Sequence, residues 1–383
     1  MSRDRLGRYK ESEETFTDAL LVAEASRSDA LAARAWGRLA WVVGERQARY
    51  AEAAGFTRHA QAMIDRMDDR DALEGELLDI ESALGYREHR YDDAIALGRR
   101  AIEHLRRAFG PSHSLVAHAL SGVADAEVER GKLDEALVDY RDTLALEERT
   151  LGHGHPDLAA TLNNMGIALK RLRRFDEATA SYERALVLRE EAFGPDHPQN
   201  AATLYNLGEV LAAAGHDDRA LPVEERALTL LERHLGPDHP DVAEALYGVA
   251  EALRALGRDE EAQRDYARAL AIDEKAFGAN HPALAAPLTG LGEVACAEHR
   301  PGDAIAPLVR ALALREADAN DVAGRASTRF ALGRALYESA RDRRRGNALV
   351  AEARSELASL GDLAGGGLSA VDAWTAAHAR DRP

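Results

Sequence analysis

The chain has 383 residues, of which 46% are hydrophobic and 30% charged but only 5% aromatic, a composition that suits thin helical layers filled by alanine and leucine. Its formal net charge of -17 disfavours nucleic acid and anionic membranes as partners, because both bind basic surfaces. The single cysteine, Cys296, excludes an intramolecular disulfide, and because neither a signal peptide nor an apolar run of about 18 residues is visible, we expect a cytoplasmic protein.

One motif, repeated every 42 residues, sets the frame for the predicted elements. A His-Pro pair recurs at this stride, a glycine precedes each pair, and an alanine lies between successive pairs. A period of about 20 to 50 residues is typical of a solenoid, whose units bury their apolar faces against their neighbours. The pairs begin at His155, His197, His239 and His281, with His113-Ser114 as a weaker copy; the glycines are Gly110, Gly152, Gly194, Gly236 and Gly278; the alanines are Ala94, Ala136, Ala178, Ala220, Ala262 and Ala304.

The N-terminal part of the chain departs from the regular repeat. Residues 7–12 align with residues 131–136, so residues 1–27 are predicted to form a half repeat, the second helix of a unit whose first helix is missing. Its open apolar face must be covered by another protein, by a second copy of the chain or by sequence upstream in a longer parent protein. The residues of this face are Phe16, Leu20 and Leu21. A divergent repeat is expected over residues 29–70.

Residues 71–322 are predicted to form six regular repeats, each of two antiparallel helices. In the unit that begins at His155, Pro156 suits the first turn of a helix, where its missing N–H is no loss. Apolar residues then recur at three- and four-residue spacing on one face of each helix, and Phe193-Gly194 ends the second helix. The two apolar stripes are Leu158, Leu162, Met165 and Leu169, and Phe175, Ala178, Tyr182, Ala185, Leu186 and Leu188.

The repeat pattern weakens toward the C-terminal end. Residues 323–361 are predicted to form a degenerate repeat, in which Gly333 and Leu336 survive but the His-Pro pair does not. Residues 362–383 are predicted to form a capping helix and a tail, after a glycine hinge at 365–367. The apolar face of that helix is Leu368, Val371 and Trp374.

The regular unit carries a recognisable pattern of residues along its two helices. After His-Pro come Leu162-Asn163-Asn164-Met165-Gly166, Phe175-Asp176-Glu177-Ala178, Arg184-Ala185-Leu186 and Phe193-Gly194. This pattern resembles the tetratricopeptide repeat of kinesin light chains. The resemblance implies an all-α, right-handed α-solenoid of helix-turn-helix units, with a concave groove that binds peptides or proteins. Its motifs are specific for the type of repeat and not for any one function.

Two further stretches are similar to the C-terminal halves of multidomain bacterial serine/threonine protein kinases. They are residues 35–52, which include Trp36 and Trp41, and residues 371–374. No glycine-rich loop, catalytic loop or metal-binding triplet accompanies them in the sequence. This similarity implies an alternative function, as the recruitment or sensory module of a signalling kinase that lacks its catalytic domain.

We expect no catalytic site, metal or cofactor. The anchor histidines are predicted to be turn residues, because stacked helices about 8 to 10 Å apart cannot bring them to one ion with ligands at about 2 Å. Cys296 and His299 lie one helical turn apart, a spacing that would suit a nucleophile and its base. We favour a structural role for this pair, because Cys296 lies near a helix end without an orienting acid or an oxyanion site.

The candidate binding surface is the groove that the resemblance implies, formed by outward positions of each first helix. These positions include an acidic column, which favours basic or mixed-charge peptides, although a solvated helix face would also be polar. Asn163 matches an asparagine that resembling proteins use to hold a peptide backbone. The candidate residues are Ser121, Asn163, Tyr205, Tyr247 and Thr289, then Asp125, Glu209, Glu251 and Glu293, then Lys170 and Arg254.

These observations predict a non-enzymatic scaffold for protein–protein interaction that binds an extended peptide or a partner protein in its groove. Neither nucleic acid nor a membrane is an expected partner. Self-association through the N-terminal half repeat is a further expectation, because that half repeat has an open apolar face.

Overall fold

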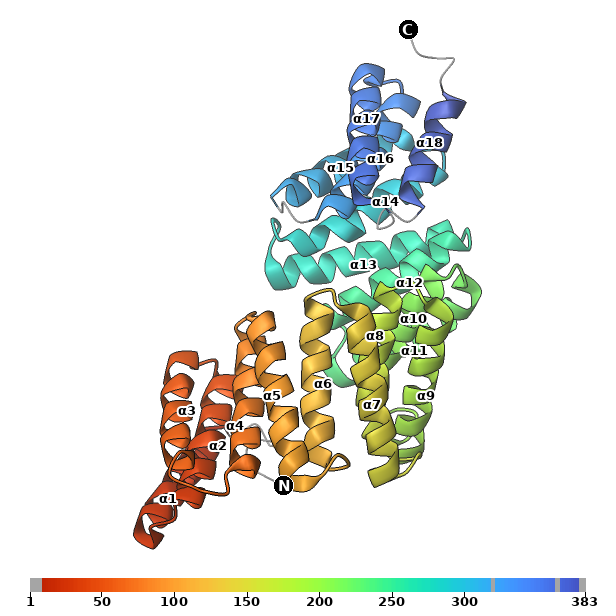
Figure 1. The fold of residues 1–383 in the computed structure, drawn as a ribbon. Coiled ribbons are helices and arrows are strands. Elements are labelled where there is room, and N and C mark those ends of the chain that lie inside the picture. Colours follow the sequence, from red (N-terminus) through yellow and green to blue (C-terminus); the bar gives the residue numbers. More distant parts are fainter. Residues whose placement is uncertain (1–8, 318–320, 362–365, 379–383) are drawn as a thin grey trace. The chain divides into compact units, whose positions relative to one another are not determined.

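The computed structural model describes residues 9–317, 321–361 and 366–378. Throughout these residues every regular element is helical, which confirms the all-α prediction (Figure 1). Residues 7 and 8 of the aligned N-terminal segment and Gly365 of the expected hinge lie outside the described residues. None of the described helices is both long enough and apolar enough to cross a lipid bilayer.

The chain divides into two compact units, and the first is Met1–Gly194. Its helices form antiparallel pairs, α2 with α3, α4 with α5, α6 with α7 and α8 with α9. The first helix of each pair also packs on the first helix of the next pair, from α2 through α4 and α6 to α8. The helices are α1 Tyr9–Ser26, α2 Asp29–Gln47, α3 Tyr50–Ile64, α4 Asp71–Arg87, α5 Tyr91–Phe109, α6 Ser114–Glu129, α7 Leu133–Leu151, α8 Leu158–Arg171 and α9 Phe175–Phe193.

The second unit, Pro195–Pro383, repeats this arrangement. The pairs are α10 with α11, α12 with α13, α14 with α15 and α16 with α17, and α10, α12, α14 and α16 pack on one another in series. The final helix, α18, packs on α17 and buries Val371 completely. The helices are α10 Asn200–Ala213, α11 Asp217–Leu235, α12 Pro240–Ala255, α13 Asp259–Phe277, a 3₁₀ turn η2 Pro282–Leu284, α14 Ala285–Ala297, α15 Pro301–Glu316, α16 Val322–Glu338, α17 Arg343–Leu360 and α18 Gly367–Ala377.

The alanines that recur at the 42-residue stride lie in the second helices of six pairs, and all six are completely buried. A methyl group lets the backbones of neighbouring helices approach closely, and a larger side chain would overpack the contact. The repeated alanine is therefore a small, fully buried residue in each of these second helices. The six residues are Ala94, Ala136, Ala178, Ala220, Ala262 and Ala304.

The anchor histidines are turn residues, as predicted; they cap α6 and α12 directly and, in the other three repeats, the short turn that precedes α8, α10 or α14. In all five repeats the ring Nδ1 atom accepts the backbone N–H two residues further on, at 3.2 or 3.3 Å. The glycine three residues before each histidine has a φ between 83° and 91°, where a side chain would be strained. Glycine thus ends one helix and histidine begins the next, which explains why both residues recur together.

The structure differs from the prediction at the start of α8. The helix begins at Leu158 and not at Pro156, because the carbonyls of His155, Pro156 and Asp157 accept hydrogen bonds from residues only three positions ahead. This pattern is a tight 3₁₀ turn, which often precedes an α-helix. In α12, by contrast, Pro240 is the first helical residue.

The N-terminal apolar face is less open than the sequence predicts. Leu20 is buried against Ala35 and Leu39 of the chain's own α2, and Phe16 packs on the same cluster. A separate protein is therefore not needed to cover these two residues. Leu21 points away from the cluster, with 63% of its surface exposed.

We predict that the capping bond of a single anchor histidine contributes measurably to stability. His239→Ala should lower the free energy of unfolding by about 1 kcal/mol, because the N–H of Asp241 loses its acceptor. His239→Asn should restore most of that loss, because asparagine is a favoured capping residue. Urea unfolding followed by circular dichroism measures both changes, and equal losses for the two variants would contradict a capping role.

Candidate peptide-binding surface

Two hollows of the second unit lie side by side along α10 and α12. Their volumes are about 380 and 470 Å³, and they share Tyr205, Asp241 and Glu244. We call these two hollows the twin pocket. The first is completed by Pro198, Ala201, Ala202, Asn206, Leu230, Leu231, His234 and Leu235, and the second by Pro240, Ala243, Tyr247, Ala269, Asp273, Phe277, Ala283, Ala286 and Pro287.

The two hollows occupy equivalent places in successive repeats. Residues that line the first recur 42 positions later in the second, at Pro198 and Pro240, Ala201 and Ala243, Tyr205 and Tyr247, Leu231 and Asp273, and Leu235 and Phe277. Each hollow therefore lies between the first helix of its repeat, the end of the second helix and the start of the next repeat. A surface built in this way offers the same kind of contact twice along one line.

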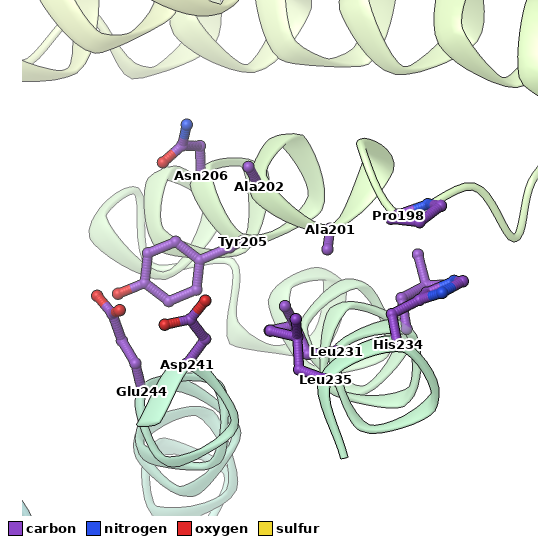
Figure 2. Close-up of a pocket in the computed structure, with 11 residues that line it drawn as sticks. Pro198, Ala201, Ala202, Tyr205, Asn206, Leu231, His234, Leu235, Asp241 and Glu244 are labelled. Atoms are coloured by element: carbon purple, nitrogen blue, oxygen red, sulfur yellow. The ribbon is translucent and has the colours of Figure 1, made fainter. Parts of the chain in front are cut away.

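Tyr205 stands at the junction of the two hollows. Figure 2 shows its ring beside α12, with the hydroxyl directed toward Glu244, while Leu231 and Leu235 of α11 lie across the pocket. Burial, together with the negative charges of Glu209 and Glu244, raises the pKa of the Tyr205 hydroxyl, so it remains a hydrogen-bond donor at neutral pH. The junction combines an aromatic ring, aliphatic walls and carboxylates.

The charged groups that line the twin pocket are mainly acidic. The carboxylates are those of Asp241, Glu244 and Asp273; His234 also lines the pocket, and its Nε2 atom lies 3.0 Å from the carbonyl oxygen of Asp196. No lysine or arginine is among the lining residues that the structure describes. The pocket therefore has a negative electrostatic character.

The acidic column predicted from the sequence is partly neutralised. Arg254 donates to Glu251 at 2.9 Å and its other terminal nitrogen lies 3.4 Å from Glu293. The hydroxyl of Tyr266 also donates to Glu251, and burial raises the pKa of Glu293. Glu251 and Glu293 therefore have partners within the protein.

Thr289 is buried. Only 7% of its area is exposed, and its hydroxyl hydrogen-bonds to Thr328 at 2.9 Å and donates to the carbonyl of Ala285. The hydroxyl of Thr289 has a partner inside the protein because Thr328 lies at the contact between the first helices α14 and α16. The sequence alone could not reveal that contact, because the C-terminal repeat departs from the pattern.

The candidate residues of the first unit are dispersed. Ser121 and Asp125 line a hollow of about 260 Å³ with Trp41, Tyr86 and His118. Asp125 of α6 accepts hydrogen bonds from Tyr140 of α7 at 2.5 Å and from Asn164 of α8 at 3.0 Å. Its carboxylate therefore links three helices of the first unit. Asn163 and Lys170 are half-buried on α8 and line neither this hollow nor the twin pocket.

Cys296 and His299 have structural positions. Only 9% of Cys296 is exposed, and burial raises the pKa of its thiol to about 11, so the thiol is protonated at neutral pH. His299 has a φ of 60° in the turn between α14 and α15, where Gly215 and Gly257 lie in earlier repeats. Among the described residues no cluster of three potential metal ligands is present.

One buried carboxyl, Glu224 of α11, was not among the residues selected from the sequence. Only 4% of its surface is exposed, and its side chain lies against Gly208. Burial first, and then the negative charges of Glu209, Asp217 and Glu251, raise its pKa to about 7. A comparison of this position across the repeats could have identified Glu224, because Tyr140, Tyr182 and Tyr266 occupy the equivalent position in other repeats.

Glu224 should make the stability of the protein depend on pH. Because its pKa is raised from 4.5 to about 7 on folding, the folded state binds the proton more tightly, and stability falls as pH rises through this window. Relative to Glu224→Gln, the wild type should lose up to about 3 kcal/mol of unfolding free energy between pH 4.5 and pH 8. Urea midpoints across this range measure the difference, with the exposed neighbour Glu225→Gln as the control. A difference that stays constant with pH would contradict the raised pKa.

Comparisons with known proteins agree with this architecture. The tetratricopeptide repeat model matches residues 82–149, 115–186, 157–233, 225–275 and 241–317, which together span more than half of the chain. A comparison with curated proteins gave no match.

Three solved structures illustrate the likeness in fold. The apo form of RapI is 15% identical, with 83% of this chain and 84% of that chain covered and a TM-score of 0.66. A Rap protein complexed with Competence and Sporulation Factor is 14% identical, with 92% and 99% covered and a TM-score of 0.52. BtubC (BKLC) from P. vanneervenii is 23% identical, with 60% and 91% covered and a TM-score of 0.53. The family match, the 42-residue stride and the paired helices together show that this chain belongs to the tetratricopeptide repeat family.

Proposed function

We propose that this protein is a non-enzymatic interaction scaffold that binds an extended peptide segment of a partner protein in the twin pocket. The observation that carries the proposal is the repetition of one largely apolar hollow at the stride of the repeat, with the carboxylates of Asp241 and Glu244 shared by its two copies. A Rap protein of similar fold is complexed with Competence and Sporulation Factor, which supports ligand binding by helical repeats of this kind.

The spacing of the hollows suits an extended chain. Neighbouring helices pack about 8 to 10 Å apart, and an extended peptide rises about 3.3 Å per residue. Side chains two or three residues apart can then enter successive hollows, and Tyr205 contacts both. A ligand of this shape needs no secondary structure of its own.

The chemistry of the walls favours lysine or arginine side chains. Their aliphatic stems can lie against Tyr205 and Leu235, or Tyr247 and Phe277, while their charged ends reach Glu244 or Asp241. Acidic peptides would meet like charges in the same place. A basic or mixed-charge peptide is therefore the ligand class that we propose.

The alternative, a recruitment module of a signalling kinase, remains a prediction from sequence similarity. The residues that carry this similarity have packing roles in the structure. Trp36 stacks on His59 with ring centres 4.7 Å apart, and Trp374 stacks on His378 at 4.3 Å. Neither contact favours the kinase alternative over a general scaffold.

We predict that peptides selected from an unbiased displayed library against the purified chain will contain basic residues two or three positions apart. The twin pocket supplies this preference through its carboxylates and its repeated spacing. Sequencing the selected pool measures it. Enrichment of acidic peptides, or of no common pattern, would contradict the proposal.

Substitution of the shared wall should weaken a selected peptide. Tyr205→Ala should lower affinity about tenfold or more through lost contact area, and Glu244→Gln a few fold through lost charge. Isothermal titration calorimetry measures both effects. Glu260→Gln, an exposed change on α13, is the matched charge control and should bind like the wild type. Equal affinities for all four proteins would place the peptide elsewhere.

A further inference from the structure

The two hollows of the twin pocket differ in the charge of one wall residue. Leu231 lines the first hollow, and Asp273, one stride later in the chain, lines the second. Figure 2 shows Leu231 beside Leu235, so this wall of the first hollow is aliphatic. The carboxylates of Asp241 and Glu244 border both hollows and cannot distinguish them. Asp273 therefore gives the second hollow a carboxylate that has no counterpart in the first.

Asp273 is buried, and its carboxylate has no partner. Only 8% of its surface is exposed, although it lines a hollow of about 470 Å³. No residue in the described part of the chain donates a hydrogen bond to this carboxylate or forms an ion pair with it. Burial raises the pKa of Asp273, while His281 lowers it and Glu244 raises it through their charges alone. A buried carboxylate without a partner is unfavourable, and a cation in the hollow would offset that cost.

An earlier repeat shows how the chain itself can satisfy an acid at this position. Glu147 occupies the same position three strides before Asp273, and it accepts a hydrogen bond from the hydroxyl of Thr161 at 2.8 Å. The counterpart of Thr161 in the repeat of Asp273 is Pro287, which has neither a hydroxyl nor a backbone N–H to donate. Pro287 also lines the second hollow. The acid is therefore present without the donor that accompanies it elsewhere, and the hollow lies where a ligand can supply one.

The other walls of the second hollow suit a long basic side chain. Tyr247 and Phe277 provide aromatic rings on which the aliphatic stem of a lysine or arginine can pack. The charged end can then reach Asp273 and Glu244 and form charge-assisted hydrogen bonds with them. An aliphatic side chain would contact the rings but leave the buried carboxylate unpaired, and an acidic one would add a like charge.

We propose that Asp273 makes the second hollow specific for one lysine or arginine side chain of the bound peptide, whereas the first hollow accepts an apolar or a basic side chain. This inference rests on the proposed function and names the residue that separates the two hollows. A ligand then carries one obligatory basic residue for the second hollow. Its residue for the first hollow, two or three positions away, tolerates replacement by leucine.

The first test exchanges the two wall residues in the full chain. Asp273→Leu gives the second hollow the wall of the first, and Leu231→Asp gives the first hollow a carboxylate. Asp273→Asn keeps the shape of the side chain and serves as a second variant should leucine alter the fold, which circular dichroism reports. Each protein selects peptides from the same unbiased displayed library, and the selected pools are sequenced.

In the wild-type pool we expect one basic position to be obligatory and the other to accept apolar residues as well. Asp273→Leu and Asp273→Asn should lose the obligatory position, and Leu231→Asp should gain a second one. The second test is isothermal titration calorimetry with the most enriched wild-type peptide and its copy with glutamine at the obligatory position. Glu260→Gln, an exposed change on the same helix as Asp273, is the control and should bind both peptides like the wild type.

Either Asp273→Asn or the glutamine copy of the peptide should weaken binding about tenfold or more. The two changes together should weaken it little further, because both remove the same contact. Losses that simply add, or a basic preference that both Asp273 variants retain, would overturn the inference and leave the proposed function intact. Equal weakening of both peptides by Asp273→Asn would also overturn it, because that result assigns the residue a structural role. A wild-type pool without basic residues, or without any binding peptide, would overturn both.

Discussion

Within each unit, the packing of each helix pair on the next pair, which brings the first helices together in series, is the constraint on which the rest of the structure depends. A repeat array has no single central core, so each layer gains its stability from the layers beside it. In the second unit this series is α10, α12, α14 and α16. The same contacts place Tyr205 and Tyr247 at equivalent points one stride apart, which turns a structural repetition into a repeated binding surface.

Because the repeats align at a fixed stride, a residue that differs from its counterparts in other repeats changes the chemistry of that one position. The buried side chains of Tyr140 and Tyr266 each donate a hydrogen bond to a nearby carboxylate and so stabilise its charge. Glu224 cannot do so when ionised, and it destabilises the fold as pH rises. A residue that lowers stability at one position of a regular array is a candidate for function, because the array would fold better with the residue that its neighbours use.

The stride predicted the fold closely because its markers have local physical causes. Histidine at a cap, glycine at a positive φ and alanine at a close contact each act within one or two repeats, so their spacing reveals the helices directly. The two-residue shift at the start of α8 depends on a local choice between 3₁₀ and α hydrogen bonds, which His-Pro permits in either form.

The candidate surface was less predictable because it depends on contacts between helices that are distant in sequence. Tyr205 and Tyr247 were visible as outward positions, but Leu231 and Phe277 come from the second helices, which a count along the first helices passes over. Burial of Thr289 against Thr328 and pairing of Arg254 with two glutamates follow from side-chain directions in space. Glu224, by contrast, could have been found by comparing every position of the stride and not only the groove positions.

Locating a bound peptide on the protein would decide whether the twin pocket is the binding surface. A library-selected peptide with a photoreactive group beside its basic residue can be cross-linked to the full chain, and the attachment sites can be mapped by mass spectrometry. We predict attachment to α10, α12 and the end of α11, around the twin pocket, and loss of attachment in Tyr205→Ala. Attachment confined to the outer faces of the second helices, or to the first unit, would contradict peptide binding in the twin pocket.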